Sequence, residues 1–85
     1  MKGPGIMSEI ARILAEITRT ADPVGVIRLC VLARGGTWPD AEIRSGLFEI
    51  QLAGLVGLGA SARTAVEDWI LQAKAHLRAA AITAA

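Results

Sequence analysis

Two side chains of this 85-residue sequence have the chemistry of a catalytic pair, Cys30 as a nucleophile and His76 as its base. A thiol attacks a substrate only as a thiolate, so a cysteine enzyme holds a base or a cation close to its sulfur. Cys30, however, lies within the apolar run "VGVIRLCVLA", where a thiol is typical of core packing. His76 lies between Lys74 and Arg78, a pattern typical of a solvated helix face. No paired carboxylates, metal-ligand cluster or phosphate loop accompanies the pair, so the sequence predicts no enzyme, no cofactor and no metal site.

The glycines of "GLVGLG", residues 54–59, invite comparison with a phosphate-binding loop. Such a loop follows a strand, and the dinucleotide fingerprint has the order G-x-G-x-x-G. Neither condition is met by the sequence. We therefore expect the glycines to form a tight connection between helices.

The large aromatic side chains are Trp38, Phe48 and Trp69. Tryptophan is enriched at the hot spots of protein interfaces, and it is also a core residue. Trp69 lies on the apolar stripe of a predicted helix, which favours the core or a shared interface. Trp38 lies at a helix entrance beside two glycines, so we expect it to be the more exposed of the two tryptophans.

The elements that must position these side chains are predicted to be helices. "SEIARILAEITRTA" places apolar residues at three- and four-residue spacing after a serine N-cap, and predicts a helix over residues 8–20. "DPVGVIRLCVLARGG" has Asp22 as N-cap, Pro23 in the first turn and two glycines at its end, so it predicts a second helix. The few polar residues of this second helix favour a central, deeply buried position.

Two further helices complete the prediction. "TWPDAEIRSGLFEIQLAG" contains a relaxed capping box that begins at Thr37, and predicts a helix that stops near Gly54. The helix should stop there because each later glycine would cost about 1 kcal/mol within a helix. "LVGLGAS" is then an apolar connection, which either packs on helices or pairs as a strand. The last helix is predicted over about residues 62–80, with Ser61 or Thr64 as its cap.

The fold class predicted from these elements is all-α, a compact four-helix domain. Residues 1–7 are expected to be a flexible leader, with Met7 as an alternative start. Residues 8–81 are expected to form a single domain, and residues 82–85 a frayed tail.

One segment resembles a known family. "EIRSGLFEIQLAGLVGL", residues 42–58, resembles the second half of a helix-turn-helix that runs into the first wing strand of a winged helix, where a helix of the form "LxELExxGLV" precedes the wing. The resemblance implies a winged-helix-like domain with Ile43–Ser45 closing the supporting helix, Gly46–Ala53 as recognition helix, and a degenerate or absent wing. It also implies an alternative function as a DNA-binding transcriptional regulator, in which Arg44 and Arg63 contact phosphates.

Charge and composition favour contact with protein. Nine basic and eight acidic residues leave a net charge of +1, and the basic residues are spread along the chain. No electrostatic footprint for nucleic acid stands out, so DNA binding is disfavoured. The apolar fraction is 53%, more than so small a core is expected to hold, and a surplus of this kind usually forms exposed patches at interfaces.

The compartment follows from the cysteine count and from the lack of long apolar runs. A single cysteine excludes an intramolecular disulfide and is typical of a reducing compartment. No run has the length of a membrane span or the pattern of a secretory signal, so we expect a cytoplasmic protein that does not contact a membrane. The abundance of Ala, Leu, Gly and Arg is typical of a GC-rich bacterial genome or of a phage that infects such a host.

The sequence therefore predicts a small, non-catalytic protein–protein interaction module. Its partner is a second copy, in a homodimer, or another protein. A short chain without a catalytic site is typical of phage or mobile-element accessory proteins that bind and modulate a host protein. The predicted contact residues are Trp38, Phe48, Leu52, Leu55, Val56 and Trp69.

Overall fold

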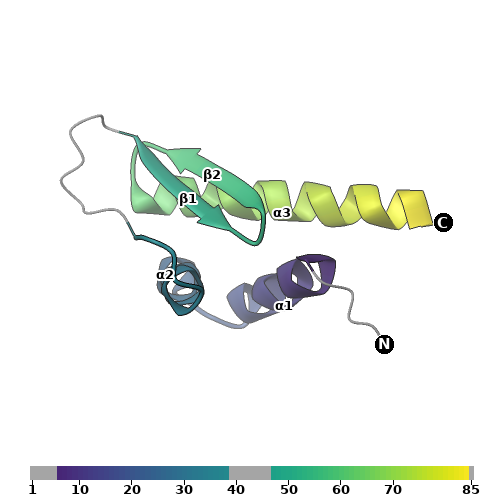
Figure 1. Cartoon of the computed structure of the whole chain (residues 1–85), viewed down its shortest axis with the longest axis horizontal. Helices are drawn as coiled ribbons and strands as arrows, with labels where there is room; N and C mark the ends of the chain where they lie inside the picture. The colour runs from purple at the N-terminus through teal and green to yellow at the C-terminus, as the bar shows by residue number, and fades with distance from the viewer. Residues whose placement is uncertain (1–5, 39–46, 85) are drawn as a thin grey trace.

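The computed structural model describes residues 6–38 and 47–84. The elements in chain order are α1 (Ile6–Thr18), α2 (Pro23–Ala33), β1 (Phe48–Leu52), β2 (Leu55–Gly59) and α3 (Ala62–Ala84). The described part of the chain is thus an α+β fold, with three helices and one two-stranded antiparallel sheet (Figure 1). The prediction of an all-α four-helix domain is wrong, because the residues expected to end the third helix form a β-hairpin instead.

The hairpin forms because its first strand has a two-residue periodicity. In "FEIQL" the apolar side chains of Phe48, Ile50 and Leu52 are buried, and the polar side chains between them are exposed. Alternate residues of a strand face the same side, so this pattern places the three apolar groups on one face. Residues 39–46, which include most of the remaining part of the predicted third helix, lie outside the described residues.

The hairpin turns through two residues, Ala53 and Gly54. Both have positive φ angles, 54° and 80°, as a two-residue type I′ turn requires. Leu52 lies opposite Leu55, and the register continues to Phe48 opposite Gly59. The segment "LVGL", left open between strand and connection by the sequence, is therefore a strand.

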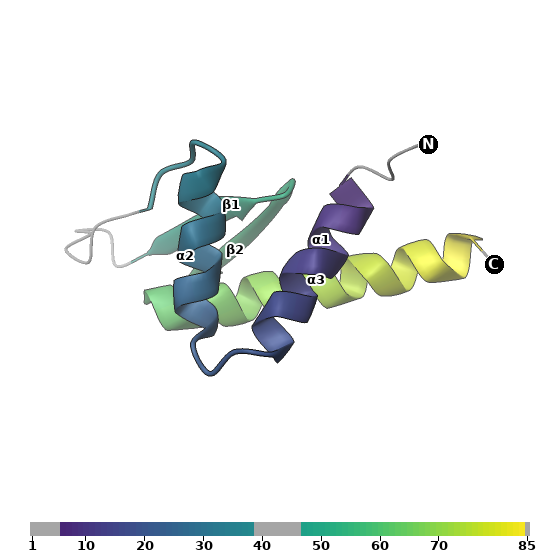
Figure 2. The same cartoon turned by 90° about the horizontal axis from the view of Figure 1, so that it is seen from below.

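The elements form two layers. The hairpin lies along the N-terminal part of α3 and forms one layer with it, and α1 and α2 form the other layer (Figure 1). Both of these helices pack against α3, and α2 also packs against β1 (Figure 2). The hairpin packs on the N-terminal part of α3, and its first strand also contacts α2. The C-terminal part of α3 extends beyond the hairpin (Figure 1).

The core lies between these layers and is centred on Trp69, whose side chain is fully buried. The indole Nε1 donates a hydrogen bond to the backbone carbonyl of Leu52 at 3.0 Å, which ties α3 to the end of β1. The buried apolar residues around it come from the three helices and β1: Ile10, Ile13, Ile27, Val31, Phe48, Ile50, Leu52, Ala65, Val66 and Ala73.

Both ends of α2 match the prediction. The side chain of Asp22 accepts a hydrogen bond from the Gly25 N–H at 3.0 Å, as an N-cap does. At the other end, Gly35 has a φ angle of 77°, and the Gly36 N–H donates to the Val31 carbonyl at 3.0 Å. This pattern is the Schellman motif that commonly ends a helix.

The position of α2 differs from the prediction. Within this helix only Ile27 and Val31 are buried, while the side chains of Leu29 and Leu32 are 69% and 47% exposed. The helix therefore lies at the surface. The most enclosed position belongs to α3, because α3 contacts both strands of the hairpin and both of the other helices.

The two remaining helices begin and end near the predicted residues. The predicted helices over residues 8–20 and 62–80 are α1 and α3 of the structure, although α1 begins at Ile6 and α3 continues to Ala84. Ser61 caps α3, since its Oγ accepts from the Thr64 N–H at 3.2 Å and its own N–H donates to the Thr64 Oγ1 at 3.0 Å. Residues 1–5 of the predicted leader lie outside the described residues.

Candidate functional site

The hairpin has one covered face and one open face. Its covered face is packed on the core through the buried side chains of β1. On the open face, the side chains of Val56 and Leu58 are 43% and 44% exposed. The residues of this open side, which we call the hairpin face, are Glu49, Gln51, Val56 and Leu58.

Strand β2 lies close to α3 because two of its inward positions are glycines. A Cβ on Gly57 would lie 2.5 Å from the Ala65 carbonyl oxygen and 2.8 Å from the Trp69 Cβ. A Cβ on Gly59 would lie 2.5 Å from the Ala65 nitrogen. These glycines are therefore part of a packed strand, which corrects the expectation that they connect two helices. The two side chains of Val56 and Leu58 are left on the outside.

The hairpin face combines apolar and acidic groups. Leu58 lies opposite Glu49, and Val56 lies opposite Gln51. The Gln51 Nε2 donates a hydrogen bond to Glu49 Oε2 at 2.7 Å, which holds the two polar side chains together on β1. Glu49 is the only charged residue in the sequence from 47 to 59, so the face is apolar on β2 and negatively charged on β1.

The two edges of the hairpin differ in their hydrogen bonding. The outer N–H of β2 at Leu58 donates to Asp68 Oδ2 of α3 at 2.9 Å. Leu52 and Leu55 close a two-residue turn and therefore form a hydrogen-bonded pair. Along an antiparallel ladder, hydrogen-bonded pairs alternate with pairs whose backbone groups point outward, and Glu49 and Gln51 belong to the second kind. Glu49 and Gln51 therefore direct their backbone N–H and C=O groups away from β2. Within residues 6–38 and 47–84, these backbone groups have no partner.

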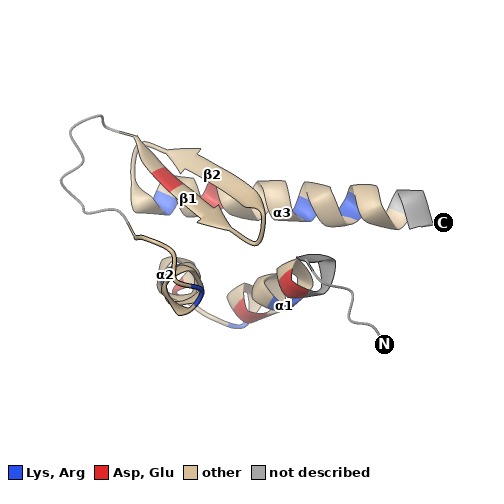
Figure 3. Cartoon of the chain, in the orientation of Figure 1, with Lys and Arg blue, Asp and Glu red and all other residues tan. Residues whose placement is uncertain are grey.

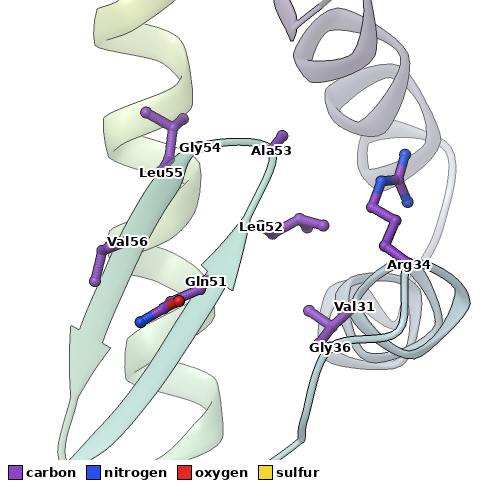
Figure 4. A pocket seen from close by; sticks show the side chains of 9 residues that line it. All are labelled: Val31, Arg34, Gly36, Gln51, Leu52, Ala53, Gly54, Leu55 and Val56. Atoms are coloured by element: carbon purple, nitrogen blue, oxygen red, sulfur yellow. The ribbon is translucent and has the colours of Figure 1, made fainter.

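Two hollows lie beside this free edge of β1. One has a volume of about 520 Å³ and is lined by Gly36, Thr37, Glu49 and Gln51. The other has a volume of about 320 Å³ and lies between the end of α2 and the hairpin turn, with Leu52 directed toward Val31 (Figure 4). Gly36 and Gln51 line both hollows, so the two are neighbours along the edge.

Comparisons with protein-family models, with curated proteins and with solved structures find no match to this chain. Evidence for a function therefore comes from the residues of the chain itself. In the part that the structure describes, no helix is both long and apolar enough to cross a membrane.

The structure divides the predicted contact residues between core and surface. Phe48, Leu52 and Trp69 are buried to 6% exposure or less, so these three serve the core rather than an outer surface. Trp38 is half-buried, and its ring meets the Phe48 ring edge-on at 5.2 Å between centroids. Leu55 is also half-buried, which leaves Val56 as the predicted contact residue on an open surface.

Sequence reasoning missed several exposed apolar side chains. Leu58 is the neighbour of Val56 on the hairpin face, and two-residue alternation along β2 would have placed both on the same side. Leu29 and Leu32 were assigned to a buried helix, but they lie on the outer surface of α2. Leu71, on α3, is 66% exposed.

Of the two residues suggested for DNA contact, the structure describes one, Arg63. Arg63 lies on α3, where its side chain is 84% exposed and its Nε lies 3.4 Å from Glu67 Oε2. Arg44 lies outside the described residues. The predicted recognition helix, Gly46–Ala53, contains β1 instead of a helix, and the hairpin has a second strand, where the sequence suggested a degenerate or absent wing.

Most charged side chains of the described chain lie on or next to the three helices, and Glu49 lies on β1 (Figure 3). Arg34, at the end of α2, pairs with Glu9 of α1 and also donates to the Cys30 carbonyl at 3.1 Å. Cys30 is half-buried against the core, whereas His76 is exposed on α3. No hydrogen bond between described residues joins the Cys30 and His76 side chains, and no group of three His, Cys, Asp or Glu side chains there is placed to hold a metal ion.

Proposed function

We propose that the chain is a small, non-catalytic protein-binding module that associates with a second copy of itself through the hairpin face. The observation that carries this proposal is the pair of exposed apolar side chains, Val56 and Leu58, on a sheet that is covered only on its other side. Neighbouring apolar groups of this kind are buried favourably when two proteins meet.

The shape of the hairpin supports the same proposal. Its backbone is fixed by the type I′ turn, by the contact of two glycines with α3 and by the Trp69 bond to Leu52. The surface therefore needs little ordering when a partner binds, which lowers the entropic cost of association. A two-fold axis would bring the same face of both copies together, so each exposed apolar pair would be covered by the other.

DNA binding has less support. In the described residues, two helices precede the hairpin and one follows it, an order that is compatible with a winged helix. A wing that contacts DNA presents basic side chains to the phosphates, whereas the only charge from residue 47 to residue 59 is that of Glu49. This acidic charge would repel the DNA backbone.

The proposal is tested by sedimentation equilibrium of the wild-type protein over a wide concentration range, compared with Leu58→Glu. The charge placed at Leu58 should weaken the self-association at least tenfold, since it would have to be buried in the interface. Leu71→Glu is the matched control, because it adds the same charge to another exposed leucine, on α3.

The outcomes of this experiment distinguish two surfaces from the absence of self-association. Weakening by Leu58→Glu alone supports the hairpin face. A wild-type protein that stays monomeric at every concentration refutes self-association. A dimer that resists Leu58→Glu but dissociates with Leu29→Glu moves the interface to α2. Titration of a labelled random DNA duplex at low and moderate salt tests the alternative, and salt-sensitive binding there would favour a DNA-binding protein.

A further inference from the structure

Strand β1 has a hydrogen-bonding edge that the described fold does not use. Glu49 and Gln51 each direct one N–H and one C=O away from β2, and the Leu58 bond to Asp68 confirms this alternation, since Leu58 lies opposite Glu49. An unpaired strand edge is a template for a further strand, and proteins commonly protect such edges with lysine, proline or a bulge. "FEIQL" has none of these protections.

There is space beside this edge for one extended chain. The two hollows together follow the outer side of β1 from Glu49 to the hairpin turn. Gly36, which lines both, contributes no side chain to them (Figure 4). A strand added to a sheet lies about 4.8 Å from its neighbour, and both hollows lie on the side of β1 where such a strand would be placed.

We propose that the free edge of β1 binds an extended peptide segment of a partner protein as a third, antiparallel strand. This inference rests on the proposed function as a protein-binding module, and it names a second kind of partner for it. A peptide fits better than the β1 strand of a second copy, because Gly36 and Thr37 face Glu49 and Gln51 across the hollow. A second copy would bring its own helices into that space, whereas a peptide brings only one backbone.

The register determines the chemistry of the peptide. In an antiparallel strand, the peptide residues opposite Gln51 and Glu49 exchange backbone hydrogen bonds with them, and their side chains lie on the hairpin face. The side chains of the peptide residues opposite Leu52 and Ile50 point to the covered side of the hairpin. Val31 lines the hollow there, so these two peptide positions favour apolar side chains. Glu49 carries the only charge nearby on the hairpin, which favours Lys or Arg opposite it. The preferred sequence, from N- to C-terminus, is apolar, any residue, apolar, basic.

The test uses the full chain and the fluorescein-labelled peptide Ser-Val-Thr-Val-Arg-Ser, acetylated and amidated at its ends, with binding followed by fluorescence anisotropy. Two N-methylated forms provide the matched comparison. Methyl groups on the threonine and arginine amides remove the donors that face β1, and binding should weaken at least tenfold. Methyl groups on the two valine amides, which point away from β1, should leave the affinity within about twofold. Equal effects of the two methylation patterns would overturn strand addition.

The charge preference is tested with Glu49→Gln and with Glu67→Gln as its control on α3. Glu49→Gln should weaken binding of the arginine peptide about threefold at low salt, and it should not affect a peptide with norleucine in place of arginine. Glu67→Gln should affect neither peptide. If Glu49→Gln weakens binding of both peptides equally, the basic residue does not lie opposite Glu49.

Amide hydrogen exchange locates the bound strand directly. The peptide should slow exchange of the Glu49 and Gln51 amides at least tenfold, because both gain a hydrogen-bond acceptor. Absence of binding at millimolar peptide, or binding that leaves these two amides unprotected, would overturn the inference. Self-association weakened by Leu58→Glu would still stand in that case, so failure of the inference and failure of the proposed function are distinguishable.

Discussion

Gly57→Ala tests the contact on which the whole hairpin depends. The added Cβ would lie 2.5 Å from the Ala65 carbonyl oxygen and 2.9 Å from the Trp69 nitrogen. These are backbone atoms within α3, so no side chain can rotate to make space. The strand must move away from the helix, and the Trp69 hydrogen bond to Leu52 is stretched with it. Overpacking of this kind costs about 1–3 kcal/mol.

The sign of the effect makes the test decisive. Alanine restricts the unfolded chain more than glycine does, so without the contact the substitution should stabilise the protein by about 0.5–1 kcal/mol. With the contact, we expect a net loss of about 1 kcal/mol in the free energy of unfolding. Since a domain of this size loses roughly 4–8 °C per kcal/mol, the melting temperature should fall by about 6 °C.

The assay is thermal and urea unfolding, followed by tryptophan fluorescence and far-UV circular dichroism at a low protein concentration. Leu58→Ala is the control, because its side chain is exposed on the same strand and should change the free energy of unfolding by less than about 0.5 kcal/mol. A Gly57→Ala protein as stable as the wild type, or more stable, would refute the close packing of β2 on α3.

Three further substitutions test other parts of the fold by the same unfolding assay. Asp22→Ala removes the acceptor of the Gly25 N–H and should cost about 1 kcal/mol, whereas Asp22→Asn should retain most of the stability. Ala53→Gly relieves a positive φ angle of 54° and should raise the free energy of unfolding by about 0.5 kcal/mol; a loss would contradict the type I′ turn. Trp69→Phe removes the donor to the Leu52 carbonyl and leaves a void, so a loss of about 2 kcal/mol or more is expected, and an unchanged midpoint would contradict its buried position.

The helices were predictable because their ends and faces follow local rules. Asp22 and Pro23 mark the start of α2, and Ser61 marks the start of α3, in both cases through hydrogen bonds between residues close in sequence. The apolar residues of α1 repeat at helical spacing over several turns. These signals depend on the chain's immediate neighbours, and for that reason they can be read without knowledge of the tertiary packing.

The hairpin was missed because its signals compete with a helical pattern. Leu47 and Ile50 have helical spacing, while Phe48, Ile50 and Leu52 have strand spacing, and the second pattern is the one that the fold uses. The turn "AG" is a weaker signal than Asn-Gly or Asp-Gly. Glycine is also disfavoured in strands, so the inward glycines of β2 concealed a strand whose packing requires them.

The contact residues were misplaced for the same reason. On a continuous helix, Phe48, Leu52 and Val56 would share one face at four-residue spacing. The two-residue turn places Val56 opposite Gln51 instead, so Val56 faces outward while Phe48 and Leu52 face the core. The composition was enough to predict that apolar side chains are exposed. Predicting which ones required the register of the hairpin.

The glycines of β2 also explain why the exposed apolar surface lies where it does. An ordinary two-stranded sheet on a helix turns the large side chains of both strands inward. Here α3 packs directly on the backbone of β2 at Gly57 and Gly59, so Val56 and Leu58 add nothing to the core. Polar residues at both positions would cost the isolated fold little, since neither side chain is enclosed. The proposed partner would account for apolar residues there, and a partner seated on Val56 and Leu58 of β2 would leave the backbone edge of β1 free for the proposed peptide.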